Sequence, residues 1–187
     1  MNVSQVTEKP GNVIKPSGSQ ETGSGTPAGK NSGNQKAKSG EIRQWAFSAQ
    51  ASSQYGDPNW AASQAVGAPN VFECGDNTNA WASKSDKSVE WIELTFKTAV
   101  IPNTILIYQN YHPSQIVEVQ MIGPDGRKSI AWDGSPEVVK NCPDLMEISV
   151  DSNNPISVNK IKITIDQRTM GWGWDEIDAV ELVGTLP

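Results

Sequence analysis

The stretch KIKITID, residues 160–166, decides the fold class. Its apolar residues Ile161, Ile163 and Ile165 alternate with charged or polar residues. Alternation with a period of two is typical of a β-strand that is buried on one face. We therefore expect a strand here, with its isoleucines facing a hydrophobic core and its charges facing water.

The same alternation recurs along the body of the chain, with Gly, Pro, Asn and Asp turn signals between the segments. We expect further strands over 89–96, 104–110, 116–123 and 178–184, and weaker ones over 42–49 and 145–150. The expected core residues on these strands are Ile92, Leu94, Ile105, Ile107, Val117, Val119, Val180 and Leu182. Only 59–67 resembles a short helix. The pattern predicts an all-β fold, an antiparallel jelly-roll β-sandwich of about eight strands.

Residues 1–40 differ sharply in composition from the rest of the chain. They contain seven Gly, six Ser and three Pro and no aromatic residue. Such a segment buries too little apolar surface to offset the entropy of ordering it. We expect a disordered, flexible linker over 1–40 and one β-sandwich domain over 41–187, tethered by the linker to a larger parent protein. Met1 would then be an expression start.

Charge and hydropathy restrict the partners. The linker carries five Lys against two Glu, so residues 41–187 carry about −9 of a net chain charge of −6. An acidic body argues against nucleic acid, and no apolar run approaches the roughly 18 residues of a membrane span. We expect no nucleic-acid partner, no membrane insertion and an extracellular or cell-surface location.

The two cysteines, Cys74 and Cys142, lie 68 residues apart and outside any CxxC motif. A disulfide is expected if the compartment is oxidising, and two buried free thiols are the alternative. A nucleophilic cysteine paired with His112 ranks well below both.

Several motifs in the body occur in one characteristic order: GAPNV (67–71), WAS (81–83), WIEL (91–94), a Y-x-x-Y-x-P segment (108–113) and EIDAVEL (176–182). This order resembles the discoidin-like domains, the galactose-binding-like jelly rolls that include coagulation factor type-C domains and many bacterial carbohydrate-binding modules. The resemblance covers nearly all of residues 43–184. It implies the fold far more specifically than the function, because this architecture hosts binders of sugars, lipids and proteins.

The resemblance also implies a possible structural calcium ion. Many discoidin-like domains hold one at a motif of the type Ala-x-Asp-Gly-Asp, but here Ala65 and Val66 are followed by Gly67, Ala68 and Pro69. Calcium takes six to eight oxygen ligands. A rebuilt site would use Asn70, Asp76, Asp57 and Glu181. The alternative is that these residues are turn formers and a solvated strand residue.

Catalysis is not expected. Asp175, Glu176 and Asp178 are close in sequence, and Glu176 and Asp178 would share one face of a strand about 7 Å apart. Paired acids perform glycoside hydrolysis, but a cluster at a strand entry more often meets water or hydrogen-bonds a loop. No GxSxG, HExxH or P-loop motif is present. We predict that the protein is not an enzyme.

The seven tryptophans are the main evidence for binding. Trp45, Trp81 and Trp91 match framework positions of the discoidin-like family, so the resemblance implies core roles for them. Trp132 is expected to be half-buried, and Trp174 to plug one end of the sandwich.

Trp172 and Trp60 lie in expected loops, and Gly171 and Gly173 would leave the Trp172 indole open. Aromatic faces with polar neighbours suit sugar rings. We expect ligand binding at a loop end, and the candidate residues are Trp172, Tyr111, His112, Asn110 and Trp60. The alternative for Tyr111 and His112 is a structural turn.

Two functions fit these observations. The first is a noncatalytic carbohydrate-binding module of an extracellular or cell-surface protein, with a glycan as partner. The second is a protein-interaction or structural domain with a cell-surface protein as partner and no small ligand. Exposed coplanar aromatics would favour the first, and a rim with every tryptophan buried would favour the second.

Overall fold

The computed structural model describes residues 40–151 and 156–187. The predicted linker, residues 1–40, therefore lies outside the described residues apart from Gly40. Within the described residues no helix is long and apolar enough to cross a membrane.

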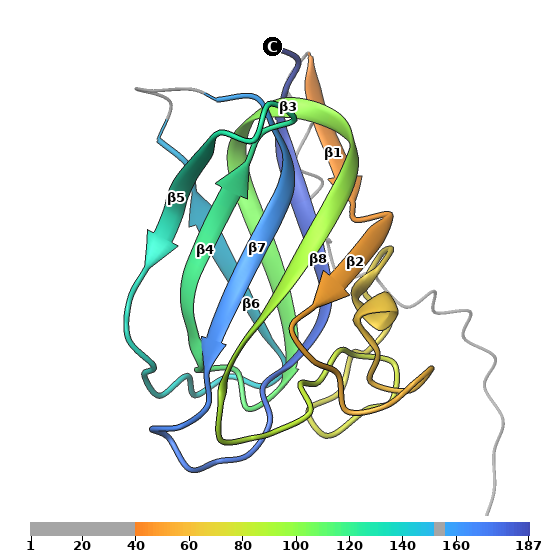
Figure 1. Cartoon of the computed structure of the whole chain (residues 1–187), viewed down its shortest axis with the longest axis vertical. Helices are drawn as coiled ribbons and strands as arrows, with labels where there is room; N and C mark the ends of the chain where they lie inside the picture. The colour runs from red at the N-terminus through yellow and green to blue at the C-terminus, as the bar shows by residue number, and fades with distance from the viewer. Residues whose placement is uncertain (1–39, 152–155) are drawn as a thin grey trace, which may run out of the picture. The chain divides into compact units, whose positions relative to one another are not determined.

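The described part of the chain is a β-sandwich of eight strands with one short 3-10 helix (Figure 1). The elements are β1 (Glu41–Trp45), β2 (Ser48–Ala51), η1 (Ala62–Ala65), β3 (Val89–Tyr111), β4 (Ile116–Ile122), β5 (Lys128–Asp133), β6 (Asp144–Ser149), β7 (Val158–Asp166) and β8 (Glu176–Thr185). All strand pairs are antiparallel. The predicted fold class is confirmed.

The long strand β3 belongs to both layers. Its first part, up to Thr95, pairs with β2 and β7, and its second part, from Ile101, pairs with β8 and β6. The register shifts between Thr95 and Val100, where the strand arches over one end of the sandwich (Figure 1). The two strands predicted at 89–96 and 104–110 are therefore one bent strand.

The core lies between the layers. Every predicted core residue is buried except Val117, which is half-buried. The register of β4 against β7 shifts between Ile116 and Glu118, and this irregularity puts Ile116 rather than Val117 into the core. Strand β5 was missed, because only Ile130 and Trp132 interrupt an otherwise small and polar segment.

Two of the three framework tryptophans are not core residues. Trp81 is fully buried, as predicted, but Trp45 and Trp91 are half-buried outside the main cluster. Trp91 lies under the Lys162 ammonium, 4.5 Å from the ring centroid, and Trp45 packs against Tyr108. Trp91 was misplaced because Ile92 takes the inward position on β3, so its neighbour faces outward. Trp132 is half-buried against the core, as predicted.

Cys74 and Cys142 form a disulfide, and their Cα atoms lie 5.1 Å apart. The bond joins the loop after η1 to the segment that leads into β6. The predicted bridge is confirmed.

The disulfide closes a 68-residue separation, so its removal should lower the free energy of unfolding by about 4 kcal/mol on the chain-entropy model. A Cys74→Ser, Cys142→Ser double variant, unfolded in urea beside the oxidised wild type, measures this. An unchanged unfolding midpoint would contradict the expectation, and the reduced wild type serves as a control for the serine side chains.

Candidate functional site

Buried carboxyl groups at the start of β8 hold the loop that follows η1. The Asp178 carboxylate accepts the backbone N–H groups of Asn70 at 3.0 Å and Val71 at 3.1 Å. Glu176 Oε2 accepts the backbone N–H of Asn77 at 3.0 Å. Both acids are almost fully buried. Of the two predicted roles for this acidic cluster, the hydrogen-bonding of a loop is the one observed.

Asn110 extends this bonding, and it does not face a ligand. Its Nδ2 group donates to the Gly75 carbonyl at 2.9 Å and to Glu176 Oε2 at 2.7 Å, and the side chain is fully buried. The Gly75 N–H in turn donates to the Asn110 carbonyl. The predicted ligand contact is corrected to a structural role: Asn110 fixes the loop beside the Cys74–Cys142 disulfide.

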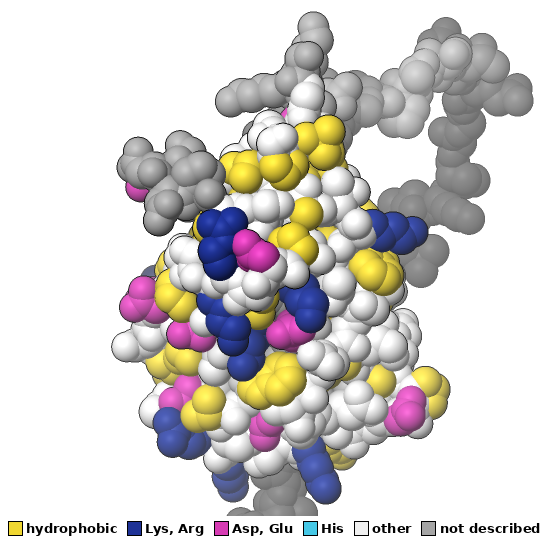
Figure 2. All heavy atoms as spheres, turned by 45° about the horizontal axis from the view of Figure 1, so that its top comes forward, with side chains coloured by type: hydrophobic (Ala, Val, Ile, Leu, Met, Phe, Trp, Pro, Cys, Tyr) yellow, Lys and Arg dark blue, Asp and Glu magenta, His cyan; other side chains and the backbone are white. Residues whose placement is uncertain are grey.

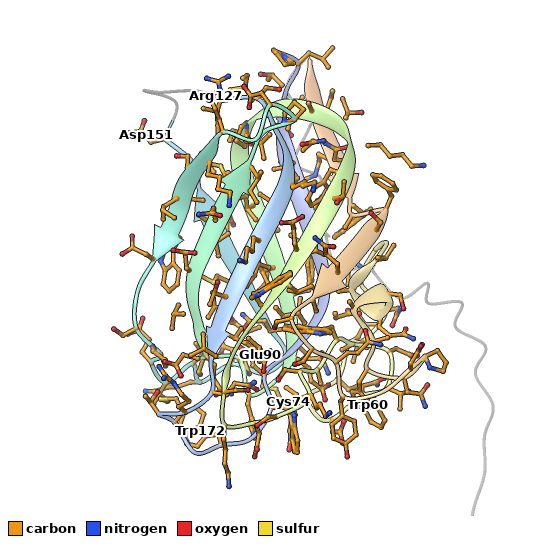
Figure 3. All side chains as sticks on the ribbon, viewed as in Figure 1. Trp60, Cys74, Glu90, Arg127, Asp151 and Trp172 are labelled. Atoms are coloured by element: carbon orange, nitrogen blue, oxygen red, sulfur yellow. A yellow bond between two sulfur atoms is a disulfide. The ribbon has the colours of Figure 1, made fainter. Side chains whose placement is uncertain are left out.

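A small pocket opens on this loop end, with a volume of about 90 Å³. Figure 3 shows Trp60, Cys74 and Trp172 together at this end of the sandwich. The lining residues, which we call the Trp60 pocket, are Tyr55, Trp60, Asp76, Ala82, Trp174 and Glu176. Three are aromatic and two are acidic, so the pocket joins apolar ring faces to hydrogen-bond acceptors.

The rings form walls at steep angles to each other. Tyr55 lies 5.2 Å from Trp60 at 76° and 5.4 Å from Trp174 at 80°, measured between ring centroids and planes. Trp60 Nε1 donates to Asp76 Oδ1 at 2.8 Å, and Trp174 Nε1 donates to the Ser83 carbonyl at 2.9 Å. Trp174, the predicted plug, is half-buried and is also one wall of the pocket.

Backbone hydrogen bonds fix the two segments that carry these rings. Tyr55 N–H donates to the Ala82 carbonyl, Ala82 N–H to the Trp60 carbonyl, and Trp60 N–H to the Thr78 carbonyl, at 2.8, 3.3 and 3.0 Å. Trp81 is bonded in both directions to Ile177 of β8. The pocket is therefore formed before any ligand arrives, which lowers the entropy cost of binding.

Burial shapes the electrostatics of this end. The pKa of the Glu176 carboxyl is raised to about 8, chiefly by desolvation and also by the neighbouring Asp76, while the bonds from Asn77 and Asn110 oppose the shift. Burial also raises the pKa of Asp178, against its two backbone donors. Asp76 and Glu176 both line the Trp60 pocket, where Asp76 contributes to the raised pKa of Glu176.

Asp175 is the most enclosed acid of the cluster. It is fully buried, and burial raises the pKa of its carboxyl well above the usual range. Backbone amides of Gln115 and Ser114 face the carboxyl and reduce the shift, but neither oxygen has a partner with full hydrogen-bond geometry among the described residues. Asp175 therefore favours the neutral form inside the sandwich.

A second aromatic group lies at the same end. Tyr111 and His112 stack with their centroids 3.9 Å apart, and His112 lies 6.5 Å from Trp172 at 58°. Trp172 is 37% exposed. Gly171 and Gly173 both have positive φ, so they allow a turn that other residues resist. The structure brings together Tyr111, His112 and Trp172, which we call the Trp172 cluster.

Within the described residues, the non-glycine residues with positive φ are Trp60 (55°) and His112 (40°). Both were candidate ligand residues. Such backbone costs on the order of 1 kcal/mol or more per residue and concentrates at binding and catalytic sites. One strained residue lies in each aromatic group.

The four calcium candidates are not brought together. Glu181 is paired with Arg43 through two hydrogen bonds of 2.9 and 2.8 Å, five residues along β8 from Glu176, or about 17 Å. Asp76 lines the Trp60 pocket, Asp57 is exposed, and Asn70 gives its N–H to Asp178. The described residues contain no group of three or more His, Cys, Asp or Glu placed to hold a metal ion. A calcium ion stays a prediction.

Sequence reasoning missed Tyr55 and the pocket role of Glu176. Tyr55 stands in SSQYGDPNW, where the Gly-Asp-Pro turn signal was visible but the partner loop was not. Glu176 was recognised as part of an acidic cluster, yet the pairing that sets it beside Asp76 spans 100 residues. Such long-range contacts leave no local pattern.

The family of the chain follows from comparison with known proteins. Residues 34–186 match the family described as "Pappalysin-1, SD scarf domain, C-terminal". The chain belongs to this family. A search of curated proteins finds no match.

Solved structures share the fold of this SD scarf domain. The family 32 carbohydrate-binding module of NanJ from C. perfringens, in complex with galactose, has 23% identity and a TM-score of 0.55, over 76% of this chain and 99% of that one. Chitosan-binding module 1 of a chitosanase/glucanase from Paenibacillus sp. IK-5 has 15% identity and a TM-score of 0.54, over 73% and 93%. The F5/8 type C domain of a Bacteroides fragilis protein has 12% identity and a TM-score of 0.52, over 76% of this chain and 93% of that one. The discoidin-like resemblance is confirmed.

The raised pKa of Glu176 predicts how stability changes with pH. Because the folded pKa of about 8 lies above the ordinary 4.5, this group favours the folded state most below pH 4.5, and the contribution is lost as pH rises through 8. A Glu176→Gln variant should therefore show a flatter stability profile between pH 4.5 and 8 than the wild type. Urea unfolding at pH 5, 6.5 and 8 measures it. The control is Glu147→Gln at an exposed position on β6. The prediction would be contradicted if the difference in unfolding free energy between the wild type and Glu176→Gln were the same at all three pH values.

Proposed function

We propose that the protein is a noncatalytic carbohydrate-binding module whose site is the loop end. The observation that carries this is the Trp60 pocket, where Tyr55, Trp60 and Trp174 present ring faces beside the Asp76 and Glu176 carboxyls. C–H faces of a sugar pack on aromatic rings, and sugar hydroxyls donate to carboxylates. The similar modules in complex with galactose and derived from a chitosanase/glucanase support a glycan as the ligand.

The geometry of the two acids supports binding over hydrolysis. Glycosidases hold their two carboxyl groups about 5 Å apart or further, so that a nucleophile or a water molecule reaches the sugar between them. Asp76 and Glu176 line one small pocket and lie close enough for Asp76 to raise the pKa of Glu176. Each also carries structural bonds, from Trp60 and from Asn77 and Asn110.

An extracellular or cell-surface setting fits this function. The Cys74–Cys142 disulfide is of the kind that persists in oxidising compartments. On the face shown in Figure 2, Lys and Arg side chains are interspersed with Asp and Glu and with scattered hydrophobic side chains.

A different residue, Phe72, favours the alternative function of a protein-interaction domain. Phe72 is 76% exposed on the loop after η1, which is unusual for a large apolar side chain. The rings of the Trp60 pocket are steeply inclined rather than coplanar, but Trp60 and Trp172 both reach the surface. The exposure of these two tryptophans argues against a purely structural domain, which would bury them.

Loss of one ring should weaken glycan binding without unfolding the protein. Trp60→Ala and Trp172→Ala should each reduce affinity by roughly 1 to 4 kcal/mol, the range for truncating a binding hot spot. A glycan array identifies ligands, and calorimetry with the tightest one compares the variants. Trp91→Ala is the matched control, because Trp91 is a half-buried tryptophan on the sheet face.

Circular dichroism establishes that each variant is folded. A folded wild type that binds no glycan on the array, with and without chelator, would contradict the proposed function. Equal affinity in Trp60→Ala and the wild type would exclude the Trp60 pocket as the site.

A further inference from the structure

The N–H groups around the Trp60 pocket are already used. The Trp60 indole donates to Asp76, the Trp174 indole donates to the Ser83 carbonyl, and the Asn110 amide donates to Glu176 and Gly75. What the pocket offers a ligand is therefore mainly carboxyl oxygen and aromatic surface; its donors are the Tyr55 hydroxyl and, below pH 8, the protonated Glu176 carboxyl.

The pocket is also small. Its 90 Å³ compares with about 300 Å³ or more for an ordinary ligand site. A single substituent therefore enters, while the ring that carries it packs against the exposed edges of Tyr55 and Trp60. Tyr55 is 54% exposed, so its ring extends beyond the pocket and can provide this surface.

We propose that this pocket receives the ammonium group of an amino sugar, so that the domain selects glycans whose amines are free. This inference rests on the proposed carbohydrate function and names its ligand class. An ammonium brings three N–H donors to a site of acceptors, and its charge is attracted both to the carboxyls and to the ring faces. The Tyr55 ring lies 5.2 Å from Trp60 and 5.4 Å from Trp174, so a cation held beside Tyr55 lies close to aromatic surface.

Other sugar substituents fit less well. The carboxylate of a uronic acid meets the acidic Asp76 side chain and is repelled. Acetylation of the amine removes its positive charge and two of its three N–H donors, and the added carbonyl can bond only to the few donors that the pocket has. A hydroxyl donates one hydrogen bond, whereas an ammonium donates three. A calcium ion needs six to eight oxygens, and this pocket is walled by three aromatic rings.

Calorimetry with a glucosamine hexamer, an N-acetylglucosamine hexamer and galactose at pH 6 tests the proposal on the wild type. We expect the glucosamine hexamer to bind at least tenfold more tightly than its acetylated form. Asp76→Asn keeps an acceptor for the Trp60 indole, and should lower the affinity for the glucosamine hexamer about tenfold. Exposed Asp133→Asn makes the same change in net charge outside the pocket and should leave affinity unchanged.

The outcomes separate the two proposals. Equal binding of both hexamers, or equal loss in the Asp76 and Asp133 variants, would overturn the amine inference. Binding of galactose or the acetylated hexamer alone would overturn it too, and would leave the carbohydrate function standing. If no sugar binds but methylammonium chloride shifts the Trp60 indole N–H resonance, the cation pocket is supported and the carbohydrate function falls. No response to any of these probes would overturn both.

Discussion

The hydrogen bonds from the loop after η1 to the buried acids of β8 are the constraint on which the loop end depends. Asp178 holds Asn70 and Val71, and Glu176 holds Asn77. These residues are more than 90 positions apart in sequence, so the bonds exist only once β8 is in the sandwich. They put Asp76 beside Glu176, and Asp76 in turn orients Trp60. The pocket is therefore a consequence of how the loop is attached.

This attachment carries a cost in stability. Carboxyl groups are expensive to bury, and Asp175, Glu176 and Asp178 all have raised pKa values for that reason. The backbone at Trp60 and His112 adds strain at the same end. The middle of the sandwich has no such cost, because the isoleucines of β7 and most of those of β3 are fully buried there among apolar neighbours. The unfavourable contributions to stability are therefore concentrated at the loop end, where the Trp60 pocket lies.

The sequence predicted the sandwich well because its signal is local. Alternation in 160–166 and in 178–184 depends only on neighbours along one strand, and both segments are strands in the structure. The errors arise where the sheet departs from regularity. An irregularity in β4 turned Val117 away from the core, and β3 crosses between layers without a break.

The candidate site was predicted less completely. Exposure of Trp172 followed from its flanking glycines, and the structure brings it near His112, as the loop argument expected. Asn110 was misassigned because nothing local shows that its amide is used by Glu176. Tyr55 and Trp174 form the pocket by packing against each other, and they are too far apart in sequence for any short motif to predict that contact.

The most direct measurement follows the indole N–H resonances of the seven tryptophans by two-dimensional NMR while the domain is titrated with a glucosamine hexamer. The loop-end site predicts saturable shifts of the Trp60 and Trp174 signals, with the buried Trp81 and the sheet-face Trp91 unaffected. Saturable shifts confined to Trp91 or Trp132 would place the ligand on the sheets instead, and would contradict the account.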